Sequence, residues 1–239
     1  MSIDKIVSLC KRRGFVFQSS EIYGGFKAVY DYGPLGVALK NNISKVWWKA
    51  MTQLHENIVG LDSAIFTHPK IWEASGHVGA FNDPLVDCKQ CKARYRADEL
   101  STDTHPEWEK MTCPNCGSKG SFTDPRQFNL MFKTSIGPIE DGSSVAYLRP
   151  ETAQGIYVNY LLVQNAMRLK VPFGIAQVGK AFRNEIVARN FIFRTREFEQ
   201  MEMEFFCKPD SADEWFKYWI DFSHDWFELL GIKKSKRNK

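Results

Sequence analysis

The chain has 239 residues, of which 44% are hydrophobic and 25% are charged, as in ordinary soluble globular proteins. The chain has 32 basic and 28 acidic residues, and without the five basic residues of its C-terminal tail the balance is 27 basic (32 − 5) against 28 acidic, so the body is not a polycation and any nucleic-acid surface must be local. No apolar run approaches the ~20 residues of a membrane span, and the N-terminus lacks a signal-peptide pattern. We therefore expect a cytoplasmic protein with no membrane partner and with reduced cysteines. We interpret the tail as a solvated end, with RNA contact as the alternative; it comprises Lys233, Lys234, Lys236, Arg237 and Lys239.

The first part of the chain alternates predicted helices with short strands. Apolar residues at helical spacing predict a helix over residues 3–10 that stops near Gly14. The glycine- and tyrosine-rich residues 19–36 predict short strands and turns. Residues 39–54 predict an amphipathic helix, and residues 63–72 a strand broken at its proline. Residues from 87 to about 122 are polar and cysteine-containing, which indicates an insert.

The second part predicts strands around one central helix. Residues 145–150 predict a strand, residues 151–169 a helix, and residues 173–186 and 196–206 two strands joined by a loop of about eight residues. Four residues of the helix are expected to face inward: Ile156, Tyr160, Leu161 and Met167. Single helices between strands, without βαβ regularity, favour an α+β fold with an antiparallel sheet flanked by helices.

The sequence also predicts a last helix with an aromatic face. Ser211 and Glu214 have the spacing of a capping box, and Gly231 marks the end of the helix. The residues expected on the aromatic face are Trp215, Trp219, Phe222 and Trp226.

The cysteines form two pairs with the spacing of zinc ligands. Cys88 and Cys91 make one C-x₂-C turn, and Cys113 and Cys116 make another. Each turn offers two thiolates, so the four residues predict one tetrahedral, structural Zn²⁺ site with no open position for catalysis. His105 is a weak competing ligand. The isolated Cys10 and Cys207 are expected to pack in the core.

The two strands at 173–206 carry charges of both signs among aromatic residues. Strand alternation puts Phe198, Gln200, Glu202, Glu204 and Phe206 on one face, and Arg183 and Glu185 on one face of the preceding strand. Such a face suits a nucleotide and an amine, because arginine binds phosphate and carboxylate binds ammonium. An edge hairpin with solvated ion pairs is equally consistent with the pattern.

Three stretches resemble a known enzyme family. Phe182-Arg183-x-Glu185 followed by Arg194-x-x-x-Phe198-x-x-x-Glu202 resembles motif 2 of the class II aminoacyl-tRNA synthetases, and residues 65–77, with Pro69, resemble their motif 1. Residues 21–42 and 148–160 resemble the homodimeric glycyl-tRNA synthetases in particular. The likeness runs from about Ile6 to Ile232. It implies a class II catalytic core that joins glycine to tRNA(Gly) through ATP and glycyl-adenylate.

The resemblance also implies site residues. Arg183 would be the catalytic residue, since it would hold the ATP α-phosphate and the glycine carbonyl oxygen. The implied ATP-binding residues are Arg183, Asn184, Glu185, Phe193, Arg194, Thr195, Arg196, Glu197 and Phe198, with Mg²⁺ bridging the phosphates. The implied glycine-binding residues are Arg96, Glu151, Phe198, Glu199, Gln200 and Glu202. Arg94 competes with Arg96 for its place, and Glu151 is alternatively an ordinary acidic first-turn residue.

The chain departs from the family pattern in two respects. No Glu-Arg dipeptide of the family's third motif occurs, and the anticodon-binding domain is absent, so we expect weak activity from this chain alone. A non-catalytic zinc-containing fragment or paralogue that binds tRNA, nucleotide or a partner is the alternative. A homodimer through motif 1 is expected. The expected segments are a first core part (1–86), a Cys₄ insert (87–122), a second core part (123–232) and the basic tail (233–239).

Overall fold

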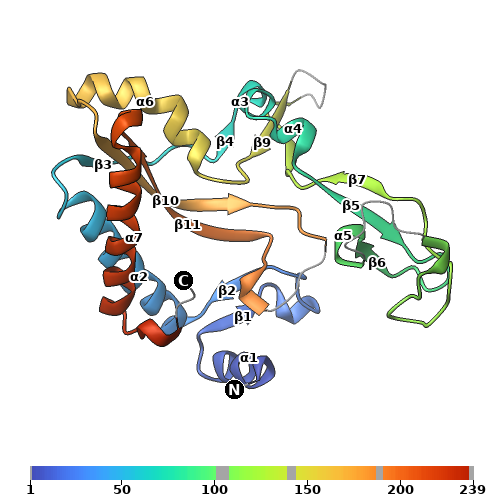
Figure 1. Ribbon diagram of the computed structural model, residues 1–239. Helices are drawn as coiled ribbons and strands as arrows, with labels where there is room; N and C mark the ends of the chain where they lie inside the picture. Colours follow the sequence, from blue (N-terminus) through green and yellow to red (C-terminus); the bar gives the residue numbers. More distant parts are fainter. Residues whose placement is uncertain (1, 101–107, 139–143, 187–190, 237–239) are drawn as a thin grey trace. The chain divides into compact units, whose positions relative to one another are not determined.

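A computed structural model describes residues 2–100, 108–138, 144–186 and 191–236 (Figure 1). His105 lies outside this part of the chain. The structure divides into two compact units. Unit 1 comprises Met1–Gly33, Ala64–Glu151 and Lys180–Phe198, and unit 2 comprises Pro34–Ser63, Thr152–Gly179 and Glu199–Lys239.

Unit 1 contains short helices and three small sheets. Its helices are α1 (Ile3–Arg12), α3 (Pro69–Ala74), α4 (His77–Ala80) and α5 (Ala97–Leu100), with 3₁₀ turns η1 (Glu21–Tyr23), η2 (Trp108–Lys110) and η3 (Phe191–Phe193). Its strands are β1 (Val16–Gln18), β2 (Tyr30–Tyr32), β4 (Phe66–Thr67), β5 (Asn82–Asp87), β6 (Arg94–Arg96), β7 (Arg126–Asn129), β8 (Lys133–Ser135) and β9 (Val145–Leu148). The sheets have the orders β1-β2, β4-β9-β8 and β6-β5-β7, and their neighbouring strands are antiparallel.

Unit 2 contains the three long helices. They are α2 (Pro34–Thr52), α6 (Ala153–Met167) and α7 (Ala212–Leu229), with 3₁₀ turns η4 (Pro209–Ser211) and η5 (Lys234–Lys236). Its sheet has the order β11-β10-β3, formed by β3 (Ile58–Gly60), β10 (Phe173–Phe182) and β11 (Glu197–Phe206). The last residues of β10 (180–182) and the first residues of β11 (197–198) belong to unit 1. None of the described helices has the length and apolar character needed to cross a membrane.

The α+β prediction is confirmed, with one unpredicted feature. Strand β3 pairs with β10 in parallel, with Ile58 opposite Gly174 and Gly60 opposite Ala176. The two strands are separated by more than a hundred residues, so no local sequence signal fixes this pairing. A parallel pair needs a long crossover, which the intervening unit 1 segment supplies.

The strands of unit 2 present opposite faces to two cores. On one face Ala176 and Met203 pack with Trp47, and Phe205 lies with its ring 4.6 Å from that of Trp215 on α7. On the other face Ile156 of α6 packs in a separate buried cluster. The period of two in β10 and β11 therefore separates a face covered by α2 and α7 from a face covered by α6, as strand alternation predicts.

Two predicted details of the helices are wrong. Leu161 and Met167 of α6 are 64% and 58% exposed, whereas Ile156 is fully buried, because α6 packs along a narrower stripe than its apolar residues occupy. Ser211 precedes α7 but makes no capping hydrogen bond; its hydroxyl donates to the Lys208 carbonyl oxygen at 3.0 Å instead. Gly231, with φ of 82°, follows the helix end as predicted.

The isolated cysteines are only half-buried. Cys10 and Cys207 both keep part of their surface accessible, so neither is the fully packed core residue that was expected.

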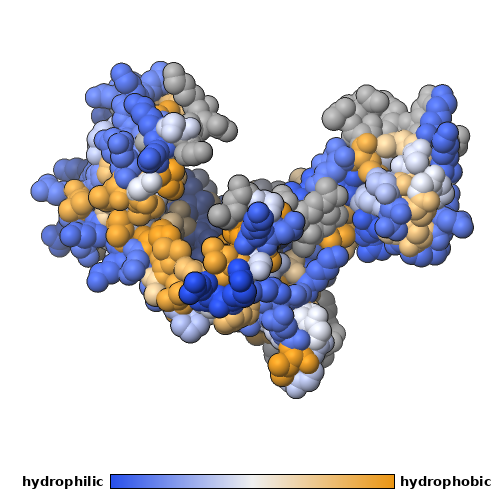
Figure 2. Space-filling model, turned by 90° about the horizontal axis from the view of Figure 1, so that it is seen from below, coloured by the Kyte–Doolittle hydropathy of each residue, from blue (hydrophilic) through white to orange (hydrophobic). Residues whose placement is uncertain are grey.

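Figure 2 shows apolar surface over the side of the chain that carries α2 and α7. Phe216 and Leu229 of α7 belong to this exposed apolar set, at 69% and 72%.

Replacing Ile156 with alanine is expected to lower the free energy of unfolding by about 2–5 kcal/mol, because the change leaves a cavity in the α6 core. Leu161→Ala on the same helix is the matched control, and should cost under about 1 kcal/mol since Leu161 is 64% exposed. Urea denaturation followed by circular dichroism measures both. Equal losses in the two variants would contradict the assignment of the buried stripe.

Candidate active site and metal centre

The backbone around Arg183 is fixed by hydrogen bonds. The amide of Arg183 donates to the Arg196 carbonyl oxygen at 2.9 Å, and that of Asn184 donates to the Leu130 carbonyl oxygen at 2.7 Å. Strand β10 ends at Phe182, so Arg183 and Glu185 do not share a strand face as predicted. The sequence pattern continued past this point, but the pairing with Leu130 diverts the chain out of the β10 ladder.

The Arg183 guanidinium lies between two aromatic rings. Its central carbon is 5.4 Å from the Phe81 ring centroid and 5.3 Å from that of Phe198. Its Nε donates to the Pro150 carbonyl oxygen at 3.0 Å. These contacts fix the plane of the guanidinium, and among the described residues its terminal nitrogens make no hydrogen bond. A planar fork held in this way suits bidentate binding of a phosphate or carboxylate.

Glu185 is a buried carboxylate with an unmet acceptor. Only 8% of the residue is exposed, and burial raises the pKa of its carboxyl group above the usual value. Its Oε2 has no hydrogen-bond partner among the described residues, with Arg194 Nε at 3.7 Å, beyond hydrogen-bond distance. A buried acceptor without a donor is costly. A ligand that brings an N–H group would remove that cost.

Arg194 and Arg96 are linked through acidic residues. Arg194 Nη1 donates to Glu99 Oε1 at 3.1 Å, and Arg96 Nε lies 3.8 Å from the same oxygen. Arg96 also pairs with Asp83 at 2.9 Å and with Asp98 at 2.7 Å. The structure therefore brings together two arginines that were predicted to bind different substrates.

Sequence reasoning missed the acidic members of this network. Asp98 and Glu99 follow Arg96 by two and three residues, and this spacing was the available signal. The hydrogen bond from Arg96 lowers the pKa of Asp98, whereas burial raises that of Asp83.

Arg94 belongs to a separate cluster. Its Nε donates to Asp87 Oδ1 at 2.6 Å, and Arg126 contacts the other oxygen of that carboxylate at 2.6 Å. The hydrogen bond from Arg94 lowers the pKa of Asp87. Arg94 and Arg96 both lie on β6, but they pair with different carboxylates.

Other predicted ATP-binding residues hold the backbone. Arg196 donates through Nε to the Glu185 carbonyl oxygen at 2.9 Å and through Nη1 to that of Lys27 at 3.2 Å. The Thr195 hydroxyl donates to the Glu197 carbonyl oxygen at 2.9 Å, and Glu197 itself pairs with Lys180. Phe193 is 81% exposed.

Glu151 lies at an aromatic wall of unit 1. One of its oxygens is 3.4 Å from His77 Nε2. The His77 ring packs against Trp72 and Phe81, each with ring centroids 5.3 Å apart. Phe81 also contacts Arg183, so Glu151 and Arg183 share neighbours within unit 1.

The predicted residues of unit 2 meet at Thr152. The Thr152 amide donates to Gln200 Oε1 at 3.1 Å, and its hydroxyl donates to Glu202. Thr152 is fully buried and was not predicted; its place directly after Glu151 was the only signal. Glu199 is not part of this group, because strand alternation turns it away, and it pairs with Lys40 at 2.6 Å.

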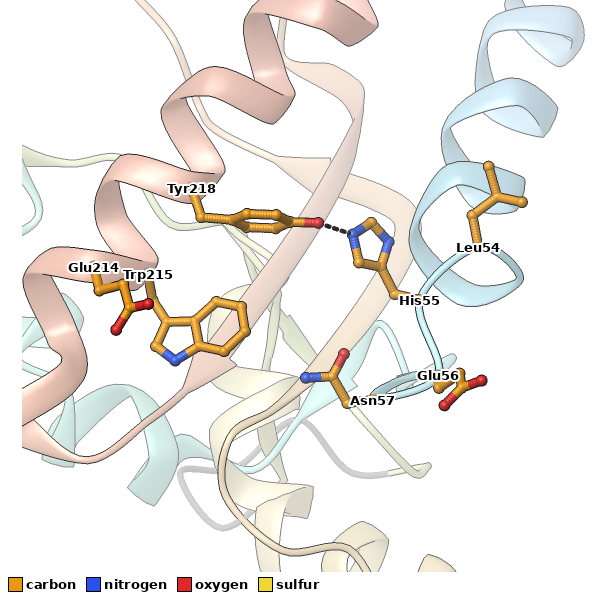
Figure 3. Close-up of a pocket in the computed structure, with 7 residues that line it drawn as sticks. All are labelled: Leu54, His55, Glu56, Asn57, Glu214, Trp215 and Tyr218. Atoms are coloured by element: carbon orange, nitrogen blue, oxygen red, sulfur yellow. Dashed lines mark hydrogen bonds between the residues drawn. The ribbon is translucent and has the colours of Figure 1, made fainter.

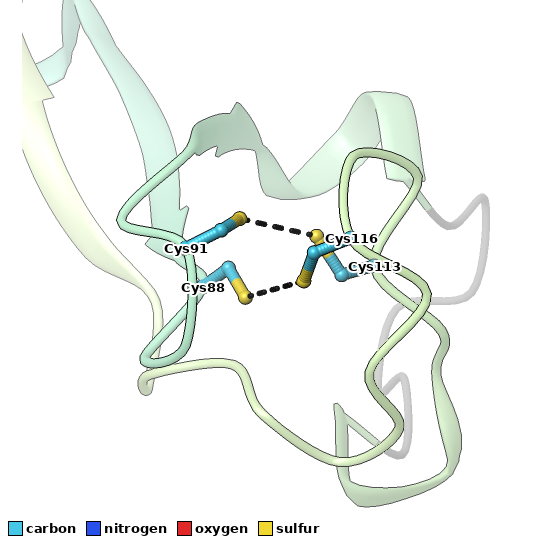
Figure 4. Close-up of side chains that lie close together, drawn as sticks. All are labelled: Cys88, Cys91, Cys113 and Cys116. Atoms are coloured by element: carbon cyan, nitrogen blue, oxygen red, sulfur yellow. Dashed lines mark hydrogen bonds between the residues drawn. The ribbon is translucent and has the colours of Figure 1, made fainter.

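The four paired cysteines come together in unit 1 (Figure 4). Their sulfur atoms all lie within 4.8 Å of one another, with 3.7 Å from Cys88 to Cys116 and from Cys91 to Cys113. Four thiolates at Zn–S distances of about 2.3 Å have tetrahedral edges of about 3.8 Å. The donor set and the spacing therefore fit a zinc ion.

The surroundings of Cys88 and Cys113 favour thiolates, whereas the pKa of Cys116 is raised. A hydrogen bond from the Cys91 backbone amide, with another from the Ser121 hydroxyl, lowers the pKa of Cys88 to about 5. The Tyr95 hydroxyl lowers that of Cys113. The cluster is packed against a small core that includes Val86 and Phe122.

Comparison with known proteins finds similar sequences. Residues 132–238 match the model of the tRNA synthetase class II core domain (G, H, P, S and T). The glycine–tRNA ligases of Treponema denticola and Borreliella burgdorferi (strain ZS7) are 65% and 64% identical over 99% and 98% of this chain, and 51% of each relative is covered. The ligase of Thermobifida fusca is 55% identical over 98% of the chain and 52% of its own length.

A solved structure shares the fold at low identity. The crystal structure described as the RNA-binding domain of threonyl-tRNA synthetase from Cryptosporidium parvum Iowa II has a TM-score of 0.55 and 17% identity, and the match covers 93% of this chain and 42% of that one. The chain spans about half the length of the curated relatives it matches. Residues 132–238 are thus similar to the class II tRNA synthetase core, and nearly the whole chain is similar to about half of the glycine–tRNA ligases.

Proposed function

We propose that this chain supplies residues that activate glycine in a glycine–tRNA ligase. A glycine carboxylate oxygen attacks the α-phosphorus of ATP, the bond to the β-phosphate oxygen breaks, and glycyl-adenylate and pyrophosphate form. The glycyl group then passes to the 3′ end of tRNA(Gly). The observation that carries the proposal is the Arg183 guanidinium, oriented by Phe81, Phe198 and the Pro150 carbonyl oxygen in a chain 65% identical to a glycine–tRNA ligase.

Arg183 and Glu185 would bind different parts of ATP. Arg183 would stabilise the negative charge that develops on the α-phosphate, where a fixed cation acts without reorganisation. Glu185 Oε2, buried and without a hydrogen-bond partner among the described residues, fits the exocyclic amino group of adenine. Phe198 would stack on the purine, and Arg194 would bind the γ-phosphate after leaving Glu99. Mg²⁺, when bound, would supply positive charge that offsets the negative charge of the phosphates.

Carboxylates would bind the glycine ammonium. We assign Glu151 and Glu202 to this role, with Gln200 and Arg96 as further glycine-site residues. Glu202 is held by the fully buried Thr152, which restricts its position. A site for glycine must exclude larger side chains, because a missing side chain offers nothing to contact. Such a site must also bind the ammonium tightly, and the Glu202 carboxylate held by Thr152 would do so.

Three further assignments belong to this proposal. Zn²⁺ bound by Cys88, Cys91, Cys113 and Cys116 would be structural, since four thiolates leave no open coordination position. Residues 65–77 would form a homodimer interface. The protein would work in the cytoplasm with tRNA(Gly) as its partner. The second candidate, binding without turnover, is favoured by the absence of a Glu-Arg dipeptide from the sequence.

Calorimetry with a non-hydrolysable glycyl-adenylate analogue tests the proposal. We expect binding, and roughly 10- to 200-fold weaker binding of the matching alanyl analogue, which adds one methyl group. Glycine-dependent exchange of pyrophosphate into ATP then separates the two candidates. Binding without exchange would identify the second candidate, and failure to bind the glycyl analogue would refute the first.

A further inference from the structure

A cavity in unit 2 is lined by none of the residues assigned above (Figure 3). Its volume is about 480 Å³. The segment between α2 and β3 forms one side, and the first turns of α7 form the other. The lining residues are Leu54, His55, Glu56, Asn57, Glu214, Trp215 and Tyr218.

Hydrogen bonds fix the donor and acceptor roles on one side of the cavity. His55 Nδ1 lies 2.8 Å from the Ala50 carbonyl oxygen, and Nε2 lies 2.8 Å from the Tyr218 hydroxyl. A carbonyl oxygen only accepts, so Nδ1 carries the proton of the neutral imidazole and Nε2 accepts from Tyr218. The hydroxyl proton of Tyr218 is thus used, and its oxygen can offer only lone pairs to a ligand.

The other polar groups are also mainly acceptors. Asn57 uses Nδ2 to donate to the Pro172 carbonyl oxygen at 3.1 Å, which leaves its Oδ1 as the acceptor. Glu56 and Glu214 are exposed carboxylates, and no lysine or arginine is among the lining residues. Among the lining residues, the side-chain donors that these hydrogen bonds leave over are the indole N–H of Trp215 and the second amide N–H of Asn57. The cavity therefore presents negative charge and lone pairs.

The aromatic wall is held in place by its neighbours. The Trp215 ring packs on Phe205 with centroids 4.6 Å apart, and its edge meets Tyr218 at 5.5 Å. Tyr218 also contacts His55 edge to face at 6.1 Å. In Figure 3 the indole lies beside the Glu214 carboxylate, and both come from α7. An aromatic face next to a carboxylate attracts a cation through the ring quadrupole and the charge together.

We propose that this cavity binds a guanidinium group, as carried by arginine. A guanidinium is planar and weakly hydrated, so it can stack on the Trp215 indole while its N–H groups donate to Glu214 and Tyr218. An ammonium has the same charge but no flat face. The guanidinium can come from a free small molecule or from an arginine side chain of a polypeptide, and both share this chemistry.

Titration with Nα-acetylarginine amide tests the proposal, with the Trp215 indole N–H followed by NMR and assigned through Trp215→Phe. The neutral isostere Nα-acetylcitrulline amide is the ligand control. We expect at least tenfold weaker binding of the citrulline compound. Glu214→Gln should weaken binding of the arginine compound by about 3- to 10-fold. The matched control Asp225→Asn, farther along the same helix, should leave it unchanged.

The outcomes separate the sources and decide the proposal. Equal affinity for free arginine and for an arginine-containing peptide supports a small-molecule ligand, and tighter peptide binding supports a polypeptide. Equal binding of the citrulline and arginine compounds overturns the proposal, and so does an unchanged affinity in a folded Glu214→Gln protein. A response of the indole to inorganic phosphate but not to the arginine compound would assign the cavity to an anion.

Discussion

Replacing Arg183 with alanine is expected to weaken binding of the glycyl-adenylate analogue by roughly 30- to 1,000-fold. The change removes a charge-assisted, bidentate contact worth roughly 2–4 kcal/mol, and tenfold in affinity corresponds to about 1.4 kcal/mol. Arg183→Lys should lie between wild type and Arg183→Ala, because lysine keeps the charge but lacks the planar fork held between Phe81 and Phe198. Calorimetry at one fixed salt concentration measures all three proteins.

Arg94→Ala is the matched control for this result. Arg94 also forms an ion pair in unit 1, but it pairs with Asp87 in a cluster separate from Arg183. Its replacement should leave analogue affinity within about twofold of wild type, since exposed ion pairs contribute under about 1 kcal/mol. Unchanged affinity in a folded Arg183→Ala protein would remove Arg183 from the substrate site.

Replacing Cys88 with serine is expected to abolish zinc binding and to unfold the region around the cysteines. A structural zinc site of this kind contributes apparent binding free energies of about 10–16 kcal/mol, and that binding is coupled to folding. Elemental analysis should find one zinc ion per wild-type chain and essentially none in the variant. Amide hydrogen exchange should show lost protection in the strands β5 and β6, which carry Val86 and Tyr95 of the small core.

Cys207→Ser is the control for zinc loss, because Cys207 is half-buried and lies outside the cluster. It should keep both the metal and the protection. A wild-type chain without zinc, or a Cys88→Ser protein with undiminished zinc, would refute the site. Retained analogue binding in the zinc-free variant would show that the metal serves structure and not glycine activation.

The sequence predicted the features that depend on local periodicity. Alternation along β11 correctly separated Gln200 and Glu202, which meet Thr152, from Met203 and Phe205, which pack with residues of α7. The C-x₂-C spacing correctly predicted that the four sulfur atoms lie close together. In both cases a residue's position follows from its near neighbours in the chain, so the pattern is sufficient.

Features that depend on distant partners were not predictable in the same way. Arg196 has the charge of a phosphate ligand, but carbonyl oxygens of Glu185 and Lys27 accept its hydrogen bonds. Leu161 and Met167 continue the apolar pattern of α6 beyond the surface that covers it. The arginine network around Glu99 joins distant segments, since Glu99 and Arg194 are 95 residues apart in the chain. Periodicity carries no information about such pairings.

Glu185 Oε2, which has no hydrogen-bond partner among the described residues, has a consequence for how this protein evolves. A buried acceptor without a donor makes the ligand-free state less stable than an apolar side chain of similar size would. Selection for thermal stability alone would therefore favour losing this carboxylate. A ligand N–H group that donates to this oxygen would restore the stability that the ligand-free state lacks. Glu185 lowers the stability of the ligand-free protein, so ligand binding, and not stability, would account for its retention.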